Sequence, residues 1–309
     1  MSGSFPLNLL KFVFFILLFL SLIFGFEKTL DFDAYYENYY SEFKQFEFGF
    51  ELTLEFFRSL GLEFEIVWIF LFGIITIFLG CIFWESRLFF ISAPNLFLLS
   101  NGFLGTQLRY ALAITTFFFI FRRYSLKKSK LHIPALLLPI TFHISIIFYA
   151  VLGICSKKIK DTFYISGYRS LFLLLFFVVF LGYVATQLDN IFLSLNYTYY
   201  IDSRFSVGKS WSSLIYLFLM CVICCLLLLK KTFYEYRHEI CLLLFVAITA
   251  IIFQSSSVVS GRLAKFVLLF EPVIIFSIFE RIRYKKQNLI LIMFILLAFY
   301  SKTFVFVYL

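Results

Sequence analysis

The residues of this sequence best suited to chemistry are Arg109 and His143, two ionisable side chains within long apolar segments. Arg109 lies 13 residues before Arg122, and His143 lies 13 residues after Lys130. At the rise of an α-helix this is about 20 Å from each basic boundary, so the two residues are expected at similar depths on antiparallel helices. A guanidinium at that depth requires an anion or a water-filled cavity, and a nearby imidazole can exchange protons near neutral pH. A structural hydrogen-bonded pair is the alternative interpretation.

The segment 27–65 combines aromatic and acidic side chains. It holds ten acidic and three basic residues, and eleven Phe or Tyr residues lie from Phe32 to Phe57. Aromatic faces stack on the C–H faces of sugars, and carboxylates accept hydrogen bonds from sugar hydroxyls, so the pattern is typical of a glycan site. A helix lying on a membrane surface is the alternative. Several aromatic residues recur at helical spacing, namely Phe32, Tyr36, Tyr39 or Tyr40, Phe43 and Phe46.

Three further basic residues are candidates for binding a multivalent anion. Arg204 and Lys209 lie in a polar segment rich in Tyr, and Arg262 follows the polar run 254–257. Several cations on one face suit a pyrophosphate. For Arg262, anchoring at a membrane interface is the alternative interpretation.

Composition identifies the elements that must position these residues. Hydrophobic residues make up 62% of the 309 residues and charged residues 15%, against about 45–50% and about 25% in soluble domains. A soluble chain of this size cannot bury that much apolar surface, which excludes a soluble enzyme, a nucleic-acid-binding module and a secreted disulfide scaffold. We therefore predict an all-α, polytopic transmembrane helical bundle. The net charge of +9 then reports orientation in the membrane.

Apolar runs long enough to span a membrane lie at 8–26, 66–84, 171–188, 211–229, 239–254, 263–280 and 288–307. The longer run 88–121 contains polar residues and Gly, and we predict two helices that turn near Asn101–Gly105. Residues 131–154 contain Pro134 and Pro139, and we predict two half-helices that turn near Pro139–His143, with a single span as the alternative.

Clusters of basic residues predict the orientation of these spans. The clusters at 122–130, 157–160, 230–237 and 281–286 are expected in the cytoplasm. The N-terminus is then cytoplasmic, and the segments 27–65 and 189–210 are outer loops. We predict a single integral membrane domain over residues 1–309 with roughly ten crossings.

Three short motifs, taken in chain order, resemble the EpsG/Wzy-type polysaccharide polymerases. Asp33-x-x-Tyr36-x-x-x-Tyr40 followed by Glu47-x-Gly49-Phe50 is similar to the first outer loop of that family. Arg109-x-x-Leu112-Ala113 is similar to its arginine helix, and Thr141-Phe142-His143-x-Ser145 resembles its Phe-His-x-Ser motif. Residue 48 is Phe, where many members have Pro. The resemblance covers residues 10–155 best.

The resemblance implies a GT-C-like fold and a polymerase of the bacterial inner membrane. Its substrates would be oligosaccharide repeat units linked to undecaprenyl pyrophosphate, joined at the periplasmic face into O-antigen or a related surface glycan. Arg109, with Arg262 second, would stabilise the departing pyrophosphate, and His143, Asp33 or Glu47 would serve the attacking hydroxyl as base or orienting acceptor. Tyr36, Tyr40, Arg204 and Lys209 are the other expected substrate contacts.

The resemblance also implies a metal-independent glycosyltransferase that has no cofactor. His132, His143 and His238 lie at different predicted depths, so we expect no metal cluster. The six cysteines are interpreted as small apolar side chains. The expected partners are the lipid-linked oligosaccharide, membrane lipid, a chain-length regulator and a flippase, without nucleic acid.

Two other function classes remain open from the sequence. A flippase for the same lipid-linked units usually has a longer chain and two similar halves, neither of which is seen here. A membrane glycosyltransferase that uses a polyprenyl-phosphate sugar typically has an acidic pair early in the first outer loop, and Asp31 and Asp33 offer a weak version of it. An acyltransferase would require a His near a carboxylate at the inner face, for which His238 and Glu239 are too ordinary a pair.

Overall fold

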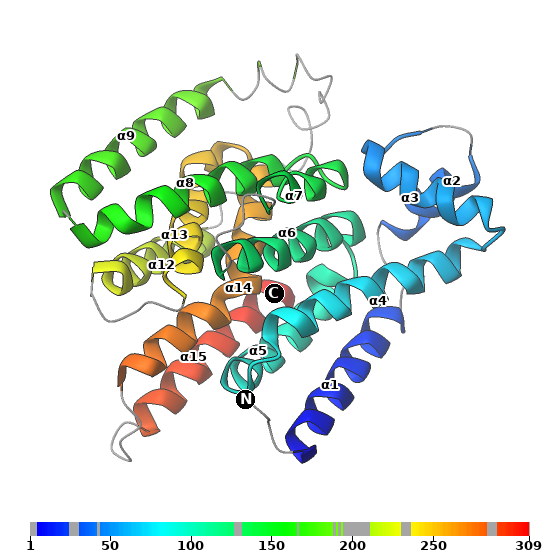
Figure 1. Ribbon diagram of the computed structural model, residues 1–309, viewed down its shortest axis with the longest axis horizontal. Helices are drawn as coiled ribbons and strands as arrows, with labels where there is room; N and C mark the ends of the chain where they lie inside the picture. Colours follow the sequence, from blue (N-terminus) through cyan, green and yellow to red (C-terminus); the bar gives the residue numbers. More distant parts are fainter. Residues whose placement is uncertain are drawn as a thin grey trace. The chain divides into compact units, whose positions relative to one another are not determined.

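The structure is a computed structural model that describes residues 5–24, 31–41, 44–126, 132–165, 167–187, 190, 193, 211–229, 236–282 and 289–308. These residues form helices and turns, without a β-strand among them (Figure 1). Within the described part of the chain, three helices are long and apolar enough to cross a membrane, namely α1 (Phe5–Ile23), α4 (Phe64–Phe83) and α12 (Trp211–Leu229). Shorter apolar helices lie at 87–99, 146–156, 175–186 and 292–302. The predicted all-helical membrane fold is thereby confirmed, while the number of crossings stays a prediction.

The described helices follow one another along the chain in two groups. The first group is α1 (Phe5–Ile23), α2 (Phe32–Tyr40), α3 (Phe48–Ser59), α4 (Phe64–Phe83), α5 (Ser86–Leu99), the π-helical turn η2 (Ser100–Leu104), α6 (Leu108–Leu126), α7 (His132–Ala135) and the 3₁₀ turn η3 (Leu138–Thr141). The second is α8 (Ile146–Ile165), α9 (Gly167–Thr186), α12 (Trp211–Leu229), α13 (Arg237–Ile252), the 3₁₀ turn η5 (Phe253–Ser255), α14 (Ser257–Ile282) and α15 (Leu289–Tyr308).

Most apolar runs correspond to helices close to their predicted limits. The run 211–229 coincides with α12, and 88–121 is a helical pair, α5 and α6, joined by η2 and a turn at 105–107. This turn lies where Asn101–Gly105 predicted it. α14 begins at Ser257, six residues before the predicted start of its span, so Arg262 lies within the helix and does not open it.

The prediction of two half-helices over 131–154 is wrong in its first half. Residues 132–141 form only the four-residue α7 and η3, followed by a turn at 142–145. Pro134 and Pro139 lack a backbone N–H and clash with the preceding turn of a helix, so a continuous half-helix cannot form there. After the turn, α8 runs without a break from Ile146 to Ile165 and includes the basic residues 157–160. His143 therefore lies in a turn and not on a helix opposite Arg109.

The helical periodicity predicted for the aromatic residues of segment 27–65 extends only to Tyr40. There α2 ends, Ser41 is extended, and α3 begins at Phe48. Phe46 thus lies in the connection between two helices, and Phe43 is outside the described residues. α3 ends in a Schellman motif, in which the Leu62 N–H donates to Phe57 O and the Gly61 N–H donates to Arg58 O. Gly61 has the φ of +70° that this motif requires.

The described helices group into two compact units, residues 1–150 with 282–309, and residues 151–281. In the first unit, α4 packs against α6 and α1, and α15 packs against α5. The Tyr300 hydroxyl donates to Ile91 O at 2.7 Å across the last pair. α2 packs its aromatic face on the first turns of α4, with ring centroids of Phe32 and Tyr35 at 5.2 and 5.6 Å from Trp68. Figure 1 shows α2 and α3 together at that end of α4.

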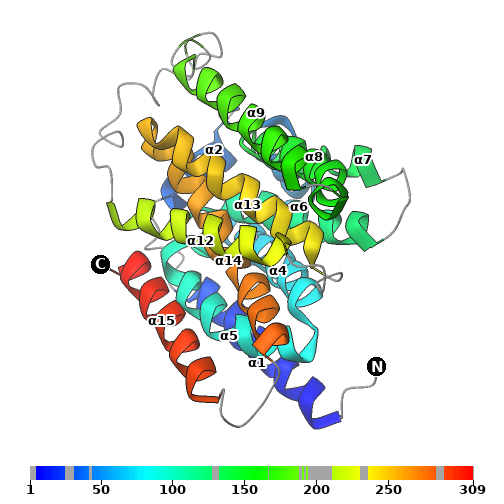
Figure 2. The ribbon, with the colours of Figure 1, turned by 90° about the vertical axis from the view of Figure 1, so that its left-hand side faces the viewer.

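In the second unit, α13 is the most completely buried helix described there. It packs against α12 and α9, and Phe245 meets Phe177 of α9 with a centroid distance of 4.7 Å. Figure 2 shows α12 and α13 running side by side. The Tyr216 hydroxyl of α12 donates to Glu271 Oε2 of α14 at 3.0 Å. These contacts join the helices of the second unit through apolar surfaces and buried polar contacts.

Candidate active site

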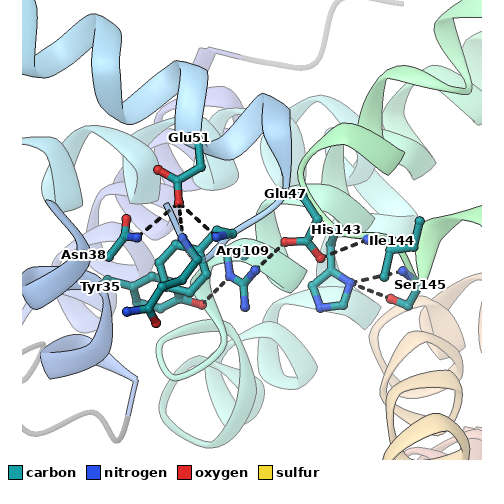
Figure 3. Close-up of polar contacts among 10 residues, drawn as sticks. Tyr35, Asn38, Glu47, Glu51, Arg109, His143, Ile144 and Ser145 are labelled. Carbon is teal, nitrogen blue, oxygen red and sulfur yellow. Dashed lines mark hydrogen bonds and ion pairs between the residues drawn. The ribbon is translucent and has the colours of Figure 1, made fainter. Parts of the chain in front are cut away.

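Arg109 and Glu47 form an ion pair at the centre of the candidate site (Figure 3). Arg109 is the second residue of α6, and Glu47 is the residue immediately before α3. Arg109 Nη1 donates to Glu47 Oε2, while Arg109 Nε donates to the Tyr35 hydroxyl at 3.3 Å. The two charged side chains are 21% and 17% exposed, so a molecule from outside can reach the pair.

The Glu47 carboxylate lies where the amino ends of three helices meet. It directly precedes α3, it binds Arg109 at the start of α6, and its Oε1 accepts the Ile144 N–H at 3.2 Å, two residues before α8. A helix amino end carries partial positive charge from its unpaired N–H groups. The Glu47 side chain makes no capping hydrogen bond to α3, and the donors described for it are the Arg109 guanidinium and the Ile144 N–H. This pair of donors favours a negative group, and in the structure the chain's own carboxylate supplies it.

Three aromatic rings surround the Arg109 guanidinium. Its Cζ lies 4.1 Å from the ring centroid of Phe46, 5.6 Å from Tyr35 and 6.0 Å from Phe50. These distances are within the range of cation–π attraction, which stabilises a partly desolvated cation. Burial raises the pKa of Tyr35, while the nearby Arg109 charge opposes this rise, so the phenol stays protonated at neutral pH. Arg109 is therefore held in one orientation by rings on α2, α3 and the connection between them.

Glu51 orders the connection that carries Phe46 and Glu47. Its side chain is buried, and Oε1 accepts three hydrogen bonds, from Asn38 Nδ2 at 3.1 Å, Gln45 N at 3.1 Å and Phe46 N at 2.9 Å. Arg58 adds an ion pair at 3.7 Å. A buried carboxylate with these partners fixes α2, the connection and α3 to one another, so Phe46 and Glu47 are presented to Arg109.

The first and third sequence motifs touch directly at Gly49 and Thr141. A β-carbon added at Gly49 would lie 2.6 Å from Thr141 Cβ and 3.0 Å from its carbonyl oxygen, so only Gly fits at this contact. The contact holds the start of α3 against η3, and it lies two residues from both Glu47 and His143. The close approach of Gly49 to Thr141 therefore brings the Glu47-x-Gly49 and Thr141-x-His143 motifs together, with Glu47 and His143 each two residues from the contact.

His143 is buried in the turn between η3 and α8. Its Nδ1 lies 3.2 Å from the backbone N and 2.8 Å from the hydroxyl of Ser145, and its ring meets Tyr110 edge to face at 5.3 Å. Tyr110 follows Arg109 on α6, and its hydroxyl lies 2.5 Å from that of Tyr149 on α8. The next residue after His143 is Ile144, whose N–H binds Glu47. Figure 3 shows the His143 ring beside the Glu47 carboxylate.

The structure brings Arg109, Glu47 and His143 into one cluster. Asp33, Tyr36 and Tyr40 lie on the exposed face of α2, where the two tyrosine rings are 4.8 Å apart. Arg262 belongs to α14 in the second unit. Arg204 and Lys209 lie outside the described residues, so their predicted roles remain predictions.

Sequence reasoning missed the residues that position this cluster. Tyr35 and Phe46 contact Arg109, and Asn38 and Glu51 order the connection. Of these four, only Phe46 was named from the sequence, as an aromatic residue at helical spacing and not as a contact of Arg109. One available signal was the spacing of Glu51, which is four residues after Glu47 and so lies on the same side of a helix that starts at 48. Among the described residues, no three His, Cys, Asp or Glu side chains form a group that could bind a metal ion.

Comparison with known proteins identifies the family of the chain. The family model for the EpsG family matches residues 10–309, which includes both units and every motif described above. No curated protein and no solved structure matches the chain. A family match of this extent covers far more than the segment that holds the three motifs. The chain belongs to the EpsG family, the family of Wzy-type polysaccharide polymerases.

Proposed function

We propose that this membrane protein joins oligosaccharide repeat units carried on undecaprenyl pyrophosphate into a surface polysaccharide. The reaction takes place at the periplasmic face of the bacterial inner membrane, with the N-terminus in the cytoplasm. The family membership supports a polymerase of this general kind. The observation that carries the proposal is that the Arg109 guanidinium and the Ile144 backbone N–H hold one partly exposed carboxylate between them. A site that holds a carboxylate in this way is suited to the negative oxygens of a phosphate.

In the proposed reaction, the growing glycan moves from its pyrophosphate to a hydroxyl of the incoming unit. The bond between the anomeric carbon and the pyrophosphate oxygen breaks, and a bond from that carbon to the acceptor oxygen forms. Pyrophosphate leaves with the bonding electron pair, so positive charge at its departure is the main catalytic requirement. Arg109 meets this need once a phosphate oxygen replaces the Glu47 carboxylate beside it.

The acceptor hydroxyl must lose its proton as the new bond forms. Glu47 is the carboxylate nearest to Arg109, and it becomes available to accept that proton when the pyrophosphate binds Arg109. We propose that the exposed face of α2 holds the sugar rings, because Tyr36 and Tyr40 are 39% and 56% exposed and Asp33 lies one turn before Tyr36. Arg262 is kept as a further contact to the pyrophosphate.

The test is a gel of surface glycan from cells in which the gene is deleted and then complemented. We expect deletion to reduce the glycan to single repeat units, and wild type to restore the full ladder. Arg109→Ala should fail to restore it, while Arg123→Ala should succeed. Arg123 is a matched control because it lies near the other end of α6 and contacts only the Phe119 ring among the interactions described for it. Immunoblots of membranes must show equal insertion.

Other outcomes would contradict the proposal in different ways. Complete loss of surface repeat units on deletion would indicate a flippase or an earlier transferase. An unchanged ladder on deletion would rule out a polymerase role. A ladder restored by Arg109→Ala would exclude Arg109 from the reaction while leaving the polymerase function intact.

A further inference from the structure

We infer that His143 acts at the proposed site as a hydrogen-bond donor through Nε2, and that Ser145 is the positioning residue that gives it this role. The inference rests on the proposed function and assigns a role to the serine of the His-x-Ser motif. The observation that carries it is the pair of contacts from Ser145 to Nδ1, at 3.2 Å from the backbone N and 2.8 Å from the hydroxyl.

The backbone contact determines which nitrogen of the imidazole carries the proton. A backbone N–H only donates, so His143 Nδ1 must accept from it and cannot itself bear a hydrogen. The neutral ring then carries its proton on Nε2. The Ser145 hydroxyl, which can donate or accept, is compatible with the same tautomer. The spacing of two residues is what allows this, because a turn brings the N–H of residue 145 back over the ring of residue 143.

The ring is held in this orientation from several directions. The His143 N–H donates to Pro139 O at 3.2 Å, and the Ile146 N–H donates to His143 O at 3.0 Å, so the backbone of the turn is fixed at both ends. Tyr110 of α6 contacts the ring edge to face, and its hydroxyl is paired with Tyr149 of α8. The side chain is only 3% exposed, which leaves little room for the ring to rotate.

The tautomer decides what His143 can contribute to the reaction. An Nε2–H can donate to a negative oxygen, and it cannot take a proton from the acceptor sugar. The N–H of Ile144, the residue after His143, binds the Glu47 carboxylate, and the His143 ring lies beside that carboxylate. A phosphate that replaces the carboxylate would therefore lie close to His143. We therefore assign His143 to the departing pyrophosphate, together with Arg109. Acceptance of the proton then falls to a carboxylate, and Glu47 is the one placed for it.

The tautomer can be measured without any assay of polymerisation. The chain has three histidines, so ¹⁵N-histidine labelling of protein in lipid nanodiscs gives a simple spectrum, and His132→Gln and His238→Gln assign the other two. We expect the Nδ1 signal of His143 in the range of an unprotonated nitrogen and the Nε2 signal in that of a protonated one. Ser145→Thr should preserve this pattern. The opposite assignment in the wild type would overturn the inference.

Two amide substitutions test the role in the reaction. The side-chain nitrogen of His143→Gln can lie close to the place of Nε2 and still donate, whereas that of His143→Asn reaches only the place of Nδ1. Neither amide can act as a base. We expect His143→Gln to keep polymer formation within about tenfold of wild type and His143→Asn to reduce it by about a hundredfold, the usual effect of losing one donor to a developing anion.

Equal loss in both variants, or equal retention, would overturn the assignment of His143 as a donor, provided that membrane levels are equal. Polymer retained by His143→Asn and lost by His143→Gln would overturn it too. A failure of the proposed function gives a different result. An unchanged ladder on gene deletion would contradict the polymerase reaction, whereas the ¹⁵N spectrum would still report the tautomer of His143.

Discussion

At the residue scale, the site depends on one carboxylate that has two partners. Glu47 joins Arg109 to the turn before α8, and both charged side chains are partly exposed. An ion pair with this exposure contributes little to stability, typically about 0–1 kcal/mol. The ion pair instead fixes the position of the Arg109 guanidinium relative to the backbone N–H of Ile144, because Glu47 binds both. We therefore expect substitutions here to affect activity far more than stability.

A double-mutant cycle on Arg109→Gln and Glu47→Gln tests this separation of activity from stability. We expect each single variant to abolish polymer, whereas the coupling between them in thermal unfolding stays at or below about 1 kcal/mol. Unfolding is followed on purified protein in detergent, and polymer is followed on gels of surface glycan. A coupling of several kcal/mol would mean that the pair is mainly structural.

The buried neighbour Glu51 should behave in the opposite way. Glu51→Ala leaves the Gln45 and Phe46 N–H groups and the Asn38 amide without their acceptor, and we expect a loss of on the order of 3 kcal/mol in unfolding free energy. Glu55→Ala is the matched control, since Glu55 is one turn further along α3 with a side chain that is 41% exposed. Its ion pair with Lys44 is exposed, so Glu55→Ala should have a much smaller effect on stability. Equal effects from both substitutions would show that Glu51 does not order the connection.

At the element scale, the start of α3 explains the departure of this chain from its family pattern. Phe48 is the first residue of α3, where a helix makes no use of the backbone N–H, and Pro is common at this position. Glu47 before it has φ −63° and ψ 145°, which is the extended conformation that a following Pro requires. A Pro at position 48 therefore fits the same backbone that Phe48 adopts.

Phe48→Pro should accordingly preserve the fold and raise the unfolding free energy by about 0.5–1 kcal/mol, because Pro restricts the unfolded chain. Phe56→Pro provides the comparison, since Phe56 is also an exposed Phe of α3 but lies inside the helix. It should lose about 3 kcal/mol or more. Thermal unfolding of the purified variants distinguishes the two, and a loss at position 48 similar to that at 56 would place the start of α3 elsewhere.

Hydropathy predicts the long elements well, and local backbone chemistry limits the rest. The runs 66–84, 88–121 and 211–229 match α4, the α5 and α6 pair, and α12, because length and apolar composition are sufficient to define them. The segment 131–145 is apolar as well, yet Pro134 and Pro139 reduce it to short turns. In the segment after Tyr40, aromatic periodicity does not reveal that the chain leaves the helix, since Phe46 keeps the spacing of a helix that has already ended.

The cluster itself was only half predictable. Arg109 and His143 stand out because charged or polar groups within apolar runs are costly, whereas Glu47 was found through the acidic and aromatic pattern of segment 27–65 and the family resemblance. Tyr35, Phe46 and Glu51 do not stand out, because their roles depend on how α2 packs against α3. The periodicity of the sequence does not predict that packing. Tyr36 and Tyr40 are exposed on α2 and stay predicted substrate contacts, while Tyr35, which the sequence did not single out, faces Arg109.

At the scale of the whole molecule, the orientation of the chain in the membrane is the main untested prediction. Gln45 lies in the connection that carries Glu47, so the proposed periplasmic site requires this residue to be outside. A Cys introduced at Gln45 should react with an impermeant maleimide in intact cells, and one at Leu126 should react only after permeabilisation. The six native cysteines must first be replaced.

A Cys at Lys158 decides between the two arrangements of residues 131–154. If the chain returns to the cytoplasm there, Lys158→Cys is protected in intact cells, like Leu126→Cys. The continuous helix α8 through this position is compatible with either side. Labelling from outside at 158 would mean a single crossing and would invert the orientation of every later helix.

The carboxylate at the meeting point of the three helix amino ends also bears on turnover. Because Glu47 is part of the chain, it is present beside Arg109 at a high effective concentration, and every anionic ligand must compete with it. In the proposed reaction, such competition weakens retention of the pyrophosphate product as well as binding of the substrate, and weaker retention is expressed mostly as faster dissociation. If the chain is the polymerase that we propose, Glu47 is therefore an internal competitor that limits inhibition by the released pyrophosphate.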